Sequence, residues 1–347
     1  MAGACRNHED REAAQAQEEI WRYMFGTTEM AILKCAVEFG IPDILENHES
    51  MTLAQLSSAI GCNSPPALYR VMRSLTNRGF FKEVKTQGES QVSYSQTALS
   101  RLLMQSNLAP FLLLQCHEVT VDSGKALAQL VSAKDGTEGE HRKNIWQRTA
   151  ADPSLNKLFN DAMACVSRVT TSKVLECYPA AFEGISSLVD VGGGNGTTLR
   201  ALTKAFPNIR GITFDRPEVV ASAPQSDVVE HVGGDFFQKI PSADAALIMW
   251  VLHNWDDDAC INILKNCREA IPKDTGKVII IDSVIDEIQD NTYRHANLIL
   301  DIIMMTNTVR GRERTSAEWG HVITAAGYSK YAIKHIPALL SIIEAFP

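Results

Sequence analysis

The chain has 347 residues, of which 45% are hydrophobic and 21% are charged, and its formal net charge is −8. This length allows two domains with a substantial core, and the composition is that of an ordinary globular protein. The acidic balance disfavours a general nucleic-acid binder, and no apolar run approaches the roughly 20 residues that span a bilayer.

The chain contains eight cysteines, and none of them forms a CxxC pair. Because the start of the chain does not show the pattern of a signal peptide, these cysteines predict reduced thiols in a cytoplasmic protein. The side chains that commonly bind metals do not cluster at metal-site spacing. We therefore expect a cytoplasmic location and no bound metal.

The first 115 residues have a mainly helical pattern. Residues 1–12 are polar, and we expect them to be mobile. Three helical patterns follow, and the second begins at Thr52, which has Gln55 three residues later, as in a capping box. Two short strand patterns around a polar loop complete the order. This predicts a winged-helix-like domain over residues 13–115. The helical patterns cover about 13–39, 51–56 and 65–75, and the strand patterns cover 79–84 and 92–94.

The pattern changes in the second half of the chain. Residues 116–180 are predicted to be a helical connection with a loop over 132–140. From Ser187 onward, strand patterns alternate with helical patterns, which predicts an α/β domain over residues 181–347 with a mostly parallel seven-stranded sheet. The expected strands are 187–191, 210–214, 228–232, 244–250, 277–282, 328–334 and one near 339–345.

A glycine-rich turn follows the first strand of this sheet. The strand ends near Asp190, and Gly192, Gly194 and Gly196 precede a helical pattern. Glycines let the backbone approach a ligand closely, and a helix N-terminus offers free N–H groups. The turn therefore predicts a site for a nucleotide-like cofactor, although such a turn also occurs without one.

Acidic residues near this turn indicate which cofactor binds. Asp190 can hold a cationic amino-acid tail, and Asp215, which ends the second strand, can accept hydrogen bonds from ribose hydroxyls. Asp235 can accept from an adenine amino group, with Phe236 against the ring, unless the two residues only form a turn with a buried aromatic. Together these residues favour S-adenosylmethionine (SAM) over a dinucleotide.

A candidate general base follows the fourth strand. His253 lies where ligands of open α/β sheets bind, and an imidazole takes up a proton near physiological pH. Either Asp282 or Glu313 can hydrogen-bond its far nitrogen and stabilise the imidazolium. The alternatives are a structural histidine, an ion pair of Glu313 with a neighbouring arginine, and a capping role for Asp282.

These segments, in this order, resemble the plant SAM-dependent O-methyltransferases of the caffeic-acid and alkaloid type over about residues 15–347. The ending Ile-Glu-Ala-Phe-Pro and the loop Asn-Gly-Thr-Thr are most similar to the enzymes acting on benzylisoquinoline alkaloids such as scoulerine and norcoclaurine. The resemblance implies a metal-independent homodimer, a Rossmann-like SAM domain and an N-terminal dimerisation domain. The segments are Leu-Val-Asp-Val-Gly-Gly-Gly-Asn-Gly, Phe-Asp-x-Pro, Gly-Gly-Asp-Phe-Phe, Leu-His-x-Trp-x-Asp and Glu-Arg-Thr.

The resemblance also implies roles for individual residues. His253 would be the general base, flanked by Asp282 and Glu313, and residues 116–180 would line the acceptor pocket. The cofactor site would consist of Asp190, Gly192, Gly194, Asp215, Asp235, Phe236, Met249 and Trp255. The acceptor site would consist of Met163, Val166, Trp250, Asn254 and Met305.

Four positions depart from the family pattern. Asn254 stands where Asp is usual, Met249 where Lys is frequent, Val166 where many relatives have Asp or His, and Arg216 where many have Leu. The first two departures remove a negative and a positive charge from the reaction centre. With these departures the acceptor stays open, and two alternatives remain: an altered reaction on the same fold, and an inactive member of the family that serves in heterodimers.

The main hypothesis is methyl transfer from SAM to a hydroxyl of a flat alkaloid, with a phenylpropanoid or flavonoid acceptor as the alternative. A phenol has a pKa of about 10, so His253 would remove its proton as the oxygen attacks the methyl group. An NAD-dependent oxidoreductase is a rival, although an obvious catalytic Lys or Tyr is lacking. A winged-helix DNA-binding protein using residues 52–84 is another, which the overall acidity disfavours.

Overall fold

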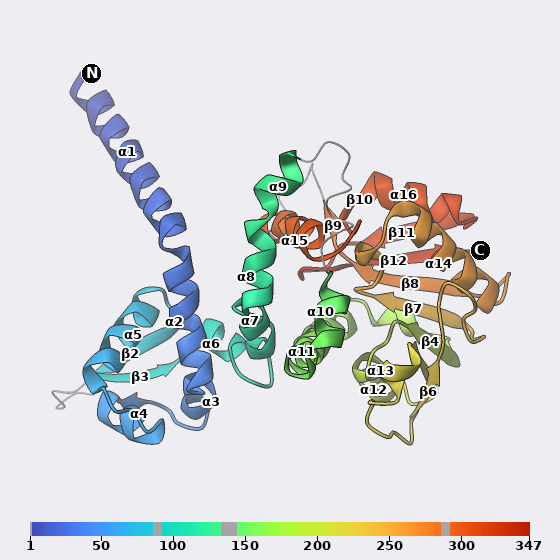
Figure 1. The fold of residues 1–347 in the computed structure, drawn as a ribbon, viewed down its shortest axis with the longest axis horizontal. Coiled ribbons are helices and arrows are strands. Elements are labelled where there is room, and N and C mark those ends of the chain that lie inside the picture. Colours follow the sequence, from blue (N-terminus) through green and yellow to red (C-terminus); the bar gives the residue numbers. More distant parts are fainter. Residues whose placement is uncertain (1, 86–91, 133–143, 286–291) are drawn as a thin grey trace. The chain divides into compact units, whose positions relative to one another are not determined.

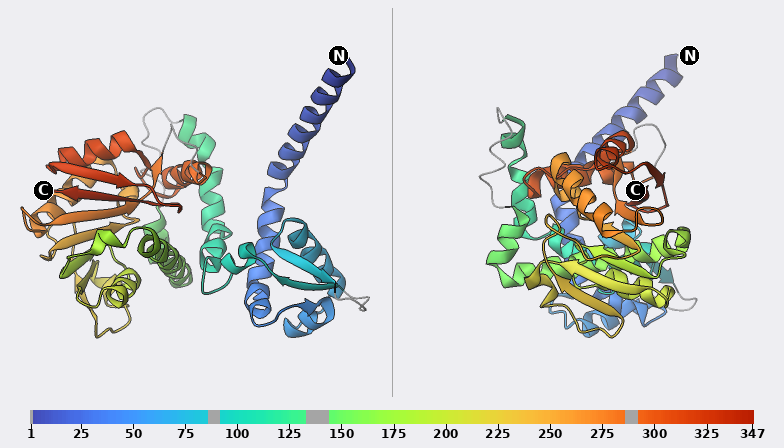
Figure 2. Two further views of the ribbon diagram at one scale, coloured as in Figure 1. Left: turned by 180° about the vertical axis from the view of Figure 1, so that it is seen from behind. Right: turned by 90° about the vertical axis from the view of Figure 1, so that its right-hand side faces the viewer.

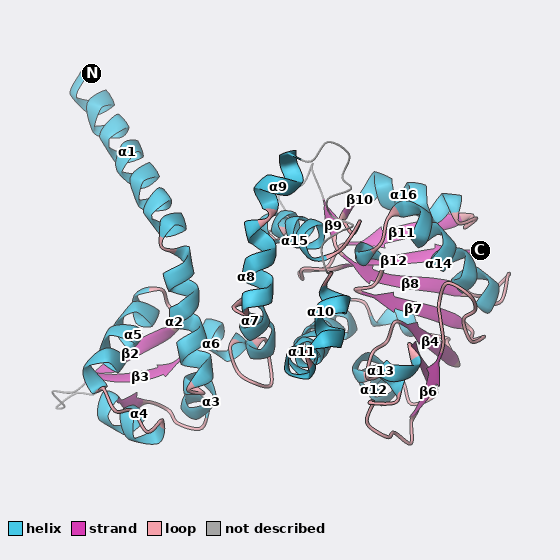
Figure 3. Ribbon diagram, in the orientation of Figure 1, coloured by secondary structure: helices cyan, strands magenta, loops and turns pink. Residues whose placement is uncertain are grey.

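The computed structural model describes residues 2–85, 92–132, 144–285 and 292–347 (Figure 1). The chain divides into an N-terminal unit, Met1–His117, and a C-terminal unit, Glu118–Pro347. Figure 3 separates the helices from the strands of each unit by colour. None of the helices in the described ranges is long and apolar enough to cross a membrane.

The N-terminal unit packs short helices around a small antiparallel sheet with the strand order β1-β3-β2. Its core contains Leu68, Met72 and Leu75 of the third predicted helix, so this face is buried inside the unit. The elements are α1 (Ala2–Met24), α2 (Gly26–Glu38), α3 (Ile41–Glu46), β1 (Met51–Thr52), α4 (Leu53–Ala59), α5 (Pro65–Asn77), β2 (Phe81–Lys85), β3 (Val92–Gln96), α6 (Ala98–Leu102) and α7 (Ala109–Gln115).

Local sequence explains these elements, with two differences from expectation. The capping box is present, because Thr52 Oγ1 accepts from the Gln55 N–H at 3.3 Å and Gln55 Oε1 accepts from the Thr52 N–H at 2.8 Å. The first helical pattern is two helices that meet at Phe25. The second difference is that helix α1 already begins at Ala2, where no helix was expected; its Ala, Glu and Arg residues favour helix, and the mobility of residues 1–12 stays a prediction.

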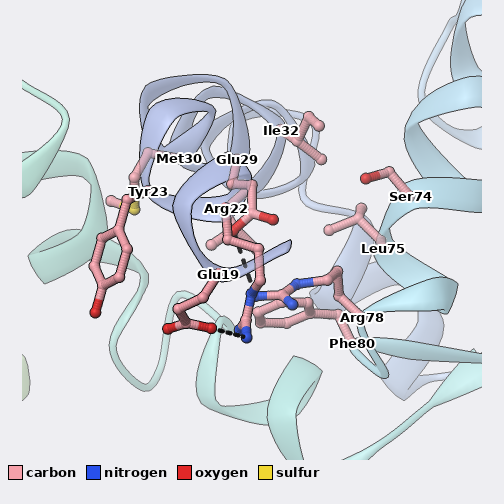
Figure 4. A pocket seen from close by; sticks show the side chains of 12 residues that line it. Glu19, Arg22, Tyr23, Glu29, Met30, Ile32, Ser74, Leu75, Arg78 and Phe80 are labelled. Carbon is pink, nitrogen blue, oxygen red and sulfur yellow. Dashed lines mark hydrogen bonds and ion pairs between the residues drawn. The ribbon is translucent and has the colours of Figure 1, made fainter. Parts of the chain in front are cut away.

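A cleft of about 380 Å³ lies in the N-terminal unit (Figure 4). Apolar side chains that include Met30, Leu75 and Phe80 line it, and charged side chains lie beside them. Two ion pairs lie in this region: Arg22 pairs with Glu19 within α1 at 3.1 Å, and Arg78 pairs with Glu29 of α2 at 3.4 Å. All residues that line the cleft belong to the N-terminal unit, whereas the predicted catalytic and cofactor-binding residues belong to the C-terminal unit.

The C-terminal unit is built on a seven-stranded sheet with the order β11-β12-β8-β7-β4-β5-β6. Strands β4 to β8 run parallel to one another, while β12 is antiparallel to both β8 and β11. The strands are β4 (Ser187–Val191), β5 (Arg210–Asp215), β6 (Val229–Gly233), β7 (Ala245–Met249), β8 (Lys277–Asp282), β11 (Lys330–Lys334) and β12 (Ser341–Phe346). The predicted mostly parallel α/β fold is confirmed.

Helices cover both faces of this sheet, as the two further views show (Figure 2). One core cluster joins the sheet to α14 and α16, and another joins it to α11 and α12. The helices are α8 (Glu118–Lys125), α9 (Leu127–Ser132), α10 (Ile145–Ala151), α11 (Pro153–Cys177), α12 (Thr197–Ala205), α13 (Pro217–Val220), α14 (Asp257–Ala270), α15 (Arg294–Asn307) and α16 (Ser316–Ala325).

Short elements complete the C-terminal unit. Two of them position site residues: the 3₁₀ helix η3 contains His253, and strand β10 begins directly after Glu313. The short elements are η2 (Pro179–Phe182), η3 (Leu252–Asn254), β9 (Val284–Ile285) and β10 (Arg314–Thr315). The loop expected over 132–140 lies outside the described residues, apart from Ser132.

The strand order places the predicted site segments side by side. Strand β4 lies between β5 and β7, so the chain reverses its direction of progress across the sheet at this point. Ligands of open α/β sheets bind in the crevice beyond the carboxyl ends of strands at such a reversal. The glycine-rich turn after β4 and the His253 segment after β7 therefore leave the sheet next to each other.

Candidate active site

The glycine-rich turn between β4 and α12 has left-handed backbone at three positions. The φ angles of Gly192, Gly194 and Gly196 are 75°, 58° and 78°, a region that favours glycine. A Cβ on Gly192 would lie 2.6 Å from Val251 Cγ2, whereas a Cβ on Gly194 would meet nothing within 4 Å. The turn is thus packed against the segment after β7, while at Gly194 its backbone borders open space.

Two acids lie beside this turn. Asp215 accepts hydrogen bonds from the Gly194 N–H at 2.8 Å and from the Arg216 N–H at 2.7 Å. Asp190 is buried, and its Oδ2 has no hydrogen-bond partner among the described residues. Burial raises the pKa of Asp190 to about 7, and the charge of Asp215 adds to this rise. A buried carboxyl oxygen without a partner is suited to a cationic ligand group such as the amino-acid tail of SAM.

The residues proposed for the adenine lie in a turn and an aromatic cluster. Asp235 accepts from the Phe237 N–H at 2.9 Å and from the Gln238 side chain at 3.2 Å, so its carboxylate closes its own turn. The ring centroids of Phe236 and Phe237 are 5.0 Å apart, and those of Phe237 and Trp255 are 4.9 Å apart. The roles of Asp235, Phe236 and Trp255 at the adenine stay predictions.

The segment after β7 contains one strained residue and is held by hydrogen bonds within the segment. Trp250 has a φ of 57°, and no other non-glycine residue in the described ranges has a positive φ. Such strain persists only where the surroundings hold it, and it is frequent at functional sites. The Asn254 side chain donates to the carbonyls of Trp250 at 3.4 Å and Val251 at 3.1 Å. An ionised Asp at this position lacks these N–H donors.

Met249 ends β7 and is half-buried.

The three predicted catalytic residues meet in the interior. The His253 side chain is buried, and its Nδ1 lies 2.8 Å from Glu313 Oε1 and 3.7 Å from Asp282 Oδ1. Asp282 Oδ2 also accepts from the backbone N–H of His253 at 3.3 Å. These residues come from η3, from the end of β8 and from the residue before β10. The structure therefore brings together groups that are far apart in sequence.

The surroundings of His253 change its basicity. Burial by itself lowers the pKa of the imidazole, but the negative charges of Asp282 and Glu313 outweigh this effect and raise it to about 9. With Nδ1 facing Glu313, Nε2 is left to exchange a proton with a ligand. His253 can therefore act as a base whose protonated form is stabilised by the carboxylates of Glu313 and Asp282.

The same three side chains have ligand atoms within 4.8 Å of one another, a spacing that a metal ion could use. The oxygens of Asp282, however, accept from the N–H groups of His253 and Ser283 at 3.3 and 3.0 Å. Glu313 Oε1 faces His253 Nδ1. Glu313 Oε2 has no hydrogen-bond partner among the described residues, but the other carboxylate oxygens already accept from N–H groups or face His253 Nδ1. The arrangement therefore fits proton transfer better than metal binding.

Comparison with known proteins identifies the family. A family model described as the O-methyltransferase domain matches residues 126–329, and one described as the O-methyltransferase dimerisation domain matches residues 21–106. The chain belongs to the O-methyltransferase family. The predicted methyl donor, SAM, is confirmed by membership in this SAM-dependent, metal-independent family. The oxidoreductase and DNA-binding alternatives are thereby set aside.

The relatives cover nearly the whole of this O-methyltransferase. Flavonoid 7-O-methyltransferase 2 of Ocimum basilicum is 45% identical over 97% of this chain and 99% of its own length. Acetylserotonin O-methyltransferase of Arabidopsis thaliana is 40% identical over 96% of this chain and 93% of its own. The solved structure of CalO1, a methyltransferase in calicheamicin biosynthesis in its SAH-bound form, superposes with a TM-score of 0.80 at 26% identity, covering 96% and 98% of the two chains.

These similarities bear on the expected acceptor. The relatives include flavonoid and acetylserotonin O-methyltransferases, and they do not show that this chain is especially similar to the benzylisoquinoline alkaloid enzymes. The residues proposed for the acceptor lie on two helices and around η3: Met163 and the buried Val166 on α11, and the exposed Met305 on α15. Their roles in this O-methyltransferase stay predictions.

Among the described residues, the arginines next to Glu313 in the chain pair with other carboxylates and leave Glu313 in contact with His253. The ion pairs of Arg310, Arg312 and Arg314 in the described structure run to Asp256, Asp257 and Glu318. Arg314 is fully buried, and our sequence analysis missed it. The available signal was its position next to Glu313 within the Glu-Arg-Thr segment, since an arginine beside a buried carboxylate must itself find partners.

The unusual ionisation of Asp190 predicts that SAM binding depends on pH. Below pH 7 the Asp190 carboxyl of the free protein is mainly protonated, and it must ionise to pair with a cationic amino group. SAM affinity should therefore fall as pH decreases from 8 to 6, by up to about tenfold for each pH unit below the pKa. Titration calorimetry measures this. Asp190→Asn should bind SAM weakly and lose most of the dependence; an unchanged pH profile in this variant would contradict the assignment.

Proposed function

We propose that this O-methyltransferase methylates a phenolic hydroxyl of a flavonoid-type acceptor, with His253 as the general base. The observation that carries the proposal is the buried His253–Glu313 pair, 2.8 Å apart, on the segment beside the SAM turn. The 45% identity to a flavonoid 7-O-methyltransferase over almost the whole chain supports the acceptor class better than our sequence-based preference for an alkaloid.

The chemistry follows from the protonation of His253. SAM, when bound, supplies a methyl group on a cationic sulfur. The acceptor hydroxyl loses its proton to His253 Nε2 while its oxygen forms the new bond to carbon and the carbon–sulfur bond breaks. Glu313 and Asp282 then stabilise the imidazolium. In the free enzyme His253 is mostly protonated at pH 7, and the positive charge of the bound donor favours loss of that proton.

The proposed reaction is tested with the purified protein, methyl-labelled SAM and a panel of flavonoids, benzylisoquinoline alkaloids and phenylpropanoids, with products read by mass spectrometry. We expect the highest kcat/KM on a flavonoid. His253→Ala should lower kcat by about 10²- to 10⁴-fold and leave SAM affinity within about twofold. Higher turnover of an alkaloid would reverse the acceptor assignment, and full turnover by His253→Ala would remove His253 as the base.

The carboxylate partner predicts a particular pH dependence. Because the His253 pKa is raised to about 9, its neutral form grows as pH rises from 7 to 9, and kcat/KM should rise with it. Glu313→Gln removes one charge that raises this pKa, so the rise should move to lower pH. The maximum should also fall by roughly 10- to 100-fold, because the imidazolium loses a stabilising charge. Glu318→Gln, at an ion pair with Arg312, is the matched control and should keep the wild-type profile. A rise that stays in place in Glu313→Gln would argue against this coupling.

We also infer that two copies of the chain assemble through the N-terminal unit. Its dimerisation-domain match is supported by apolar side chains around the end of α1 that are at least half exposed in the single chain, which marks an interaction surface. They are Ile20, Trp21, Tyr23, Met24 and Phe25. Of these, Tyr23 also lines the cleft in Figure 4. Both copies would present the same surface, as in a two-fold dimer.

The mass in solution tests the homodimer. Light scattering should give twice the chain mass of 38.2 kDa. Trp21→Glu places a charge in the apolar surface and should raise the dissociation constant at least about tenfold. Val131→Glu, at an exposed position on α9, is the control and should leave the mass unchanged. A monomeric wild-type protein would contradict the inference.

A further inference from the structure

Arg314 has no role in the reaction as described so far, yet it is the most completely paired charge near the site. Its side chain is 0% exposed. Its Nε and Nη2 donate to Asp257 Oδ1 at 2.9 and 2.8 Å, and its guanidinium carbon lies 5.3 Å from the centre of the Trp319 ring. A guanidinium is costly to bury unless its donors are paired, so this position is built around it.

The remaining donors of Arg314 reach the segment that carries the base. Nη1 donates to the carbonyl of Leu252 at 3.3 Å, and Nη2 donates to the carbonyl of Trp255 at 2.8 Å. These two carbonyls lie immediately before His253 and two residues after it. One rigid planar group therefore holds both ends of the short turn on which the imidazole stands.

Arg314 also follows Glu313 directly in the chain. Two backbones meet here: the one that carries the imidazole and the one that carries its carboxylate partner. They are joined by the Arg312 N–H, which donates to the His253 carbonyl at 2.9 Å, and by the Arg314 side chain, which fixes the carbonyls on either side of His253. A flexible link there would let the 2.8 Å contact between His253 and Glu313 open. Misplacement of a catalytic group by about 1 Å can cost about 10²-fold in rate.

We propose that Arg314 is a positioning residue that locks the turn of His253 in register with Glu313. The inference rests on the proposed role of His253 as the base. Lysine cannot replace it, because an ammonium group lacks the planar fork that reaches Asp257 and both carbonyls together. The charged groups that face His253 are Asp282, Glu313 and Arg314, and the positive charge of Arg314 lowers the pKa of His253.

Arg314→Met tests this proposal beside Arg312→Met as the matched control. Arg312 pairs with the same Asp257, at 2.8 Å, but its side chain is 41% exposed and its other ion pair is with Glu318. We expect kcat of Arg314→Met to fall roughly 10- to 100-fold, with SAM affinity within about twofold. Arg314→Lys should not restore it, and Arg312→Met should keep kcat within about twofold.

The pH profile separates positioning from general stability. Arg314→Lys keeps the positive charge but loses the planar fork, so opening of the His253–Glu313 contact should lower the pKa of His253. The rise of kcat/KM in this variant should therefore move to lower pH, in the direction expected for Glu313→Gln. A lower rate with an unmoved profile, or a parallel loss of SAM binding, would reduce Arg314 to a structural role. If Arg314→Met does not fold, Asp257→Asn, which weakens the anchor of the guanidinium, decides: a smaller loss of kcat with the same shift supports the proposal, and wild-type kinetics overturn it. Full turnover by His253→Ala would instead refute the proposed function itself.

Discussion

A histidine that takes up a proton in a buried place needs fixed negative charge beside it, and the C-terminal unit is organised around that requirement. Glu313 and Asp282 supply the charge at His253, and each carboxylate must in turn be held. Asp282 is held by backbone N–H groups, whereas Glu313 depends on the segment that Arg314 anchors. The site is thus one connected polar network, in which charged and polar groups of three chain segments balance one another.

The sheet order places this network beside the glycine-rich turn. Because β4 and β7 are neighbours, the turn that we expect to bind the donor and the turn that carries the proposed base leave the sheet side by side. Gly192 adds a direct constraint, since any side chain there would collide with Val251, two residues before His253. The left-handed glycine is therefore needed as much for contact between the two turns as for a ligand, which a motif by itself does not reveal.

The C-terminal ending carries little information about the acceptor, for a physical reason. The ending Ile-Glu-Ala-Phe-Pro, which favoured alkaloid enzymes, overlaps β12, a strand that pairs with both β8 and β11. Within it Glu344 pairs with Lys277 at 2.9 Å and accepts from the Tyr178 hydroxyl at 2.9 Å. Similarity in such a segment reflects packing of the sheet.

The Asn at position 254, where Asp is usual, is explained by its side-chain hydrogen bonds to two carbonyls.

Hydrophobic periodicity and the glycine-rich turn by themselves determined the α/β class, the seven strands and SAM as the methyl donor, because these depend on residues close together in the chain. His253 and its two carboxylates were also visible, each as the polar end of a segment. Tertiary structure alone decided that Glu313 pairs with His253 while the nearby arginines pair elsewhere, and that Arg314 holds the turn. Such pairings depend on which distant segments become neighbours when the sheet forms, and spacing along the chain does not carry that information.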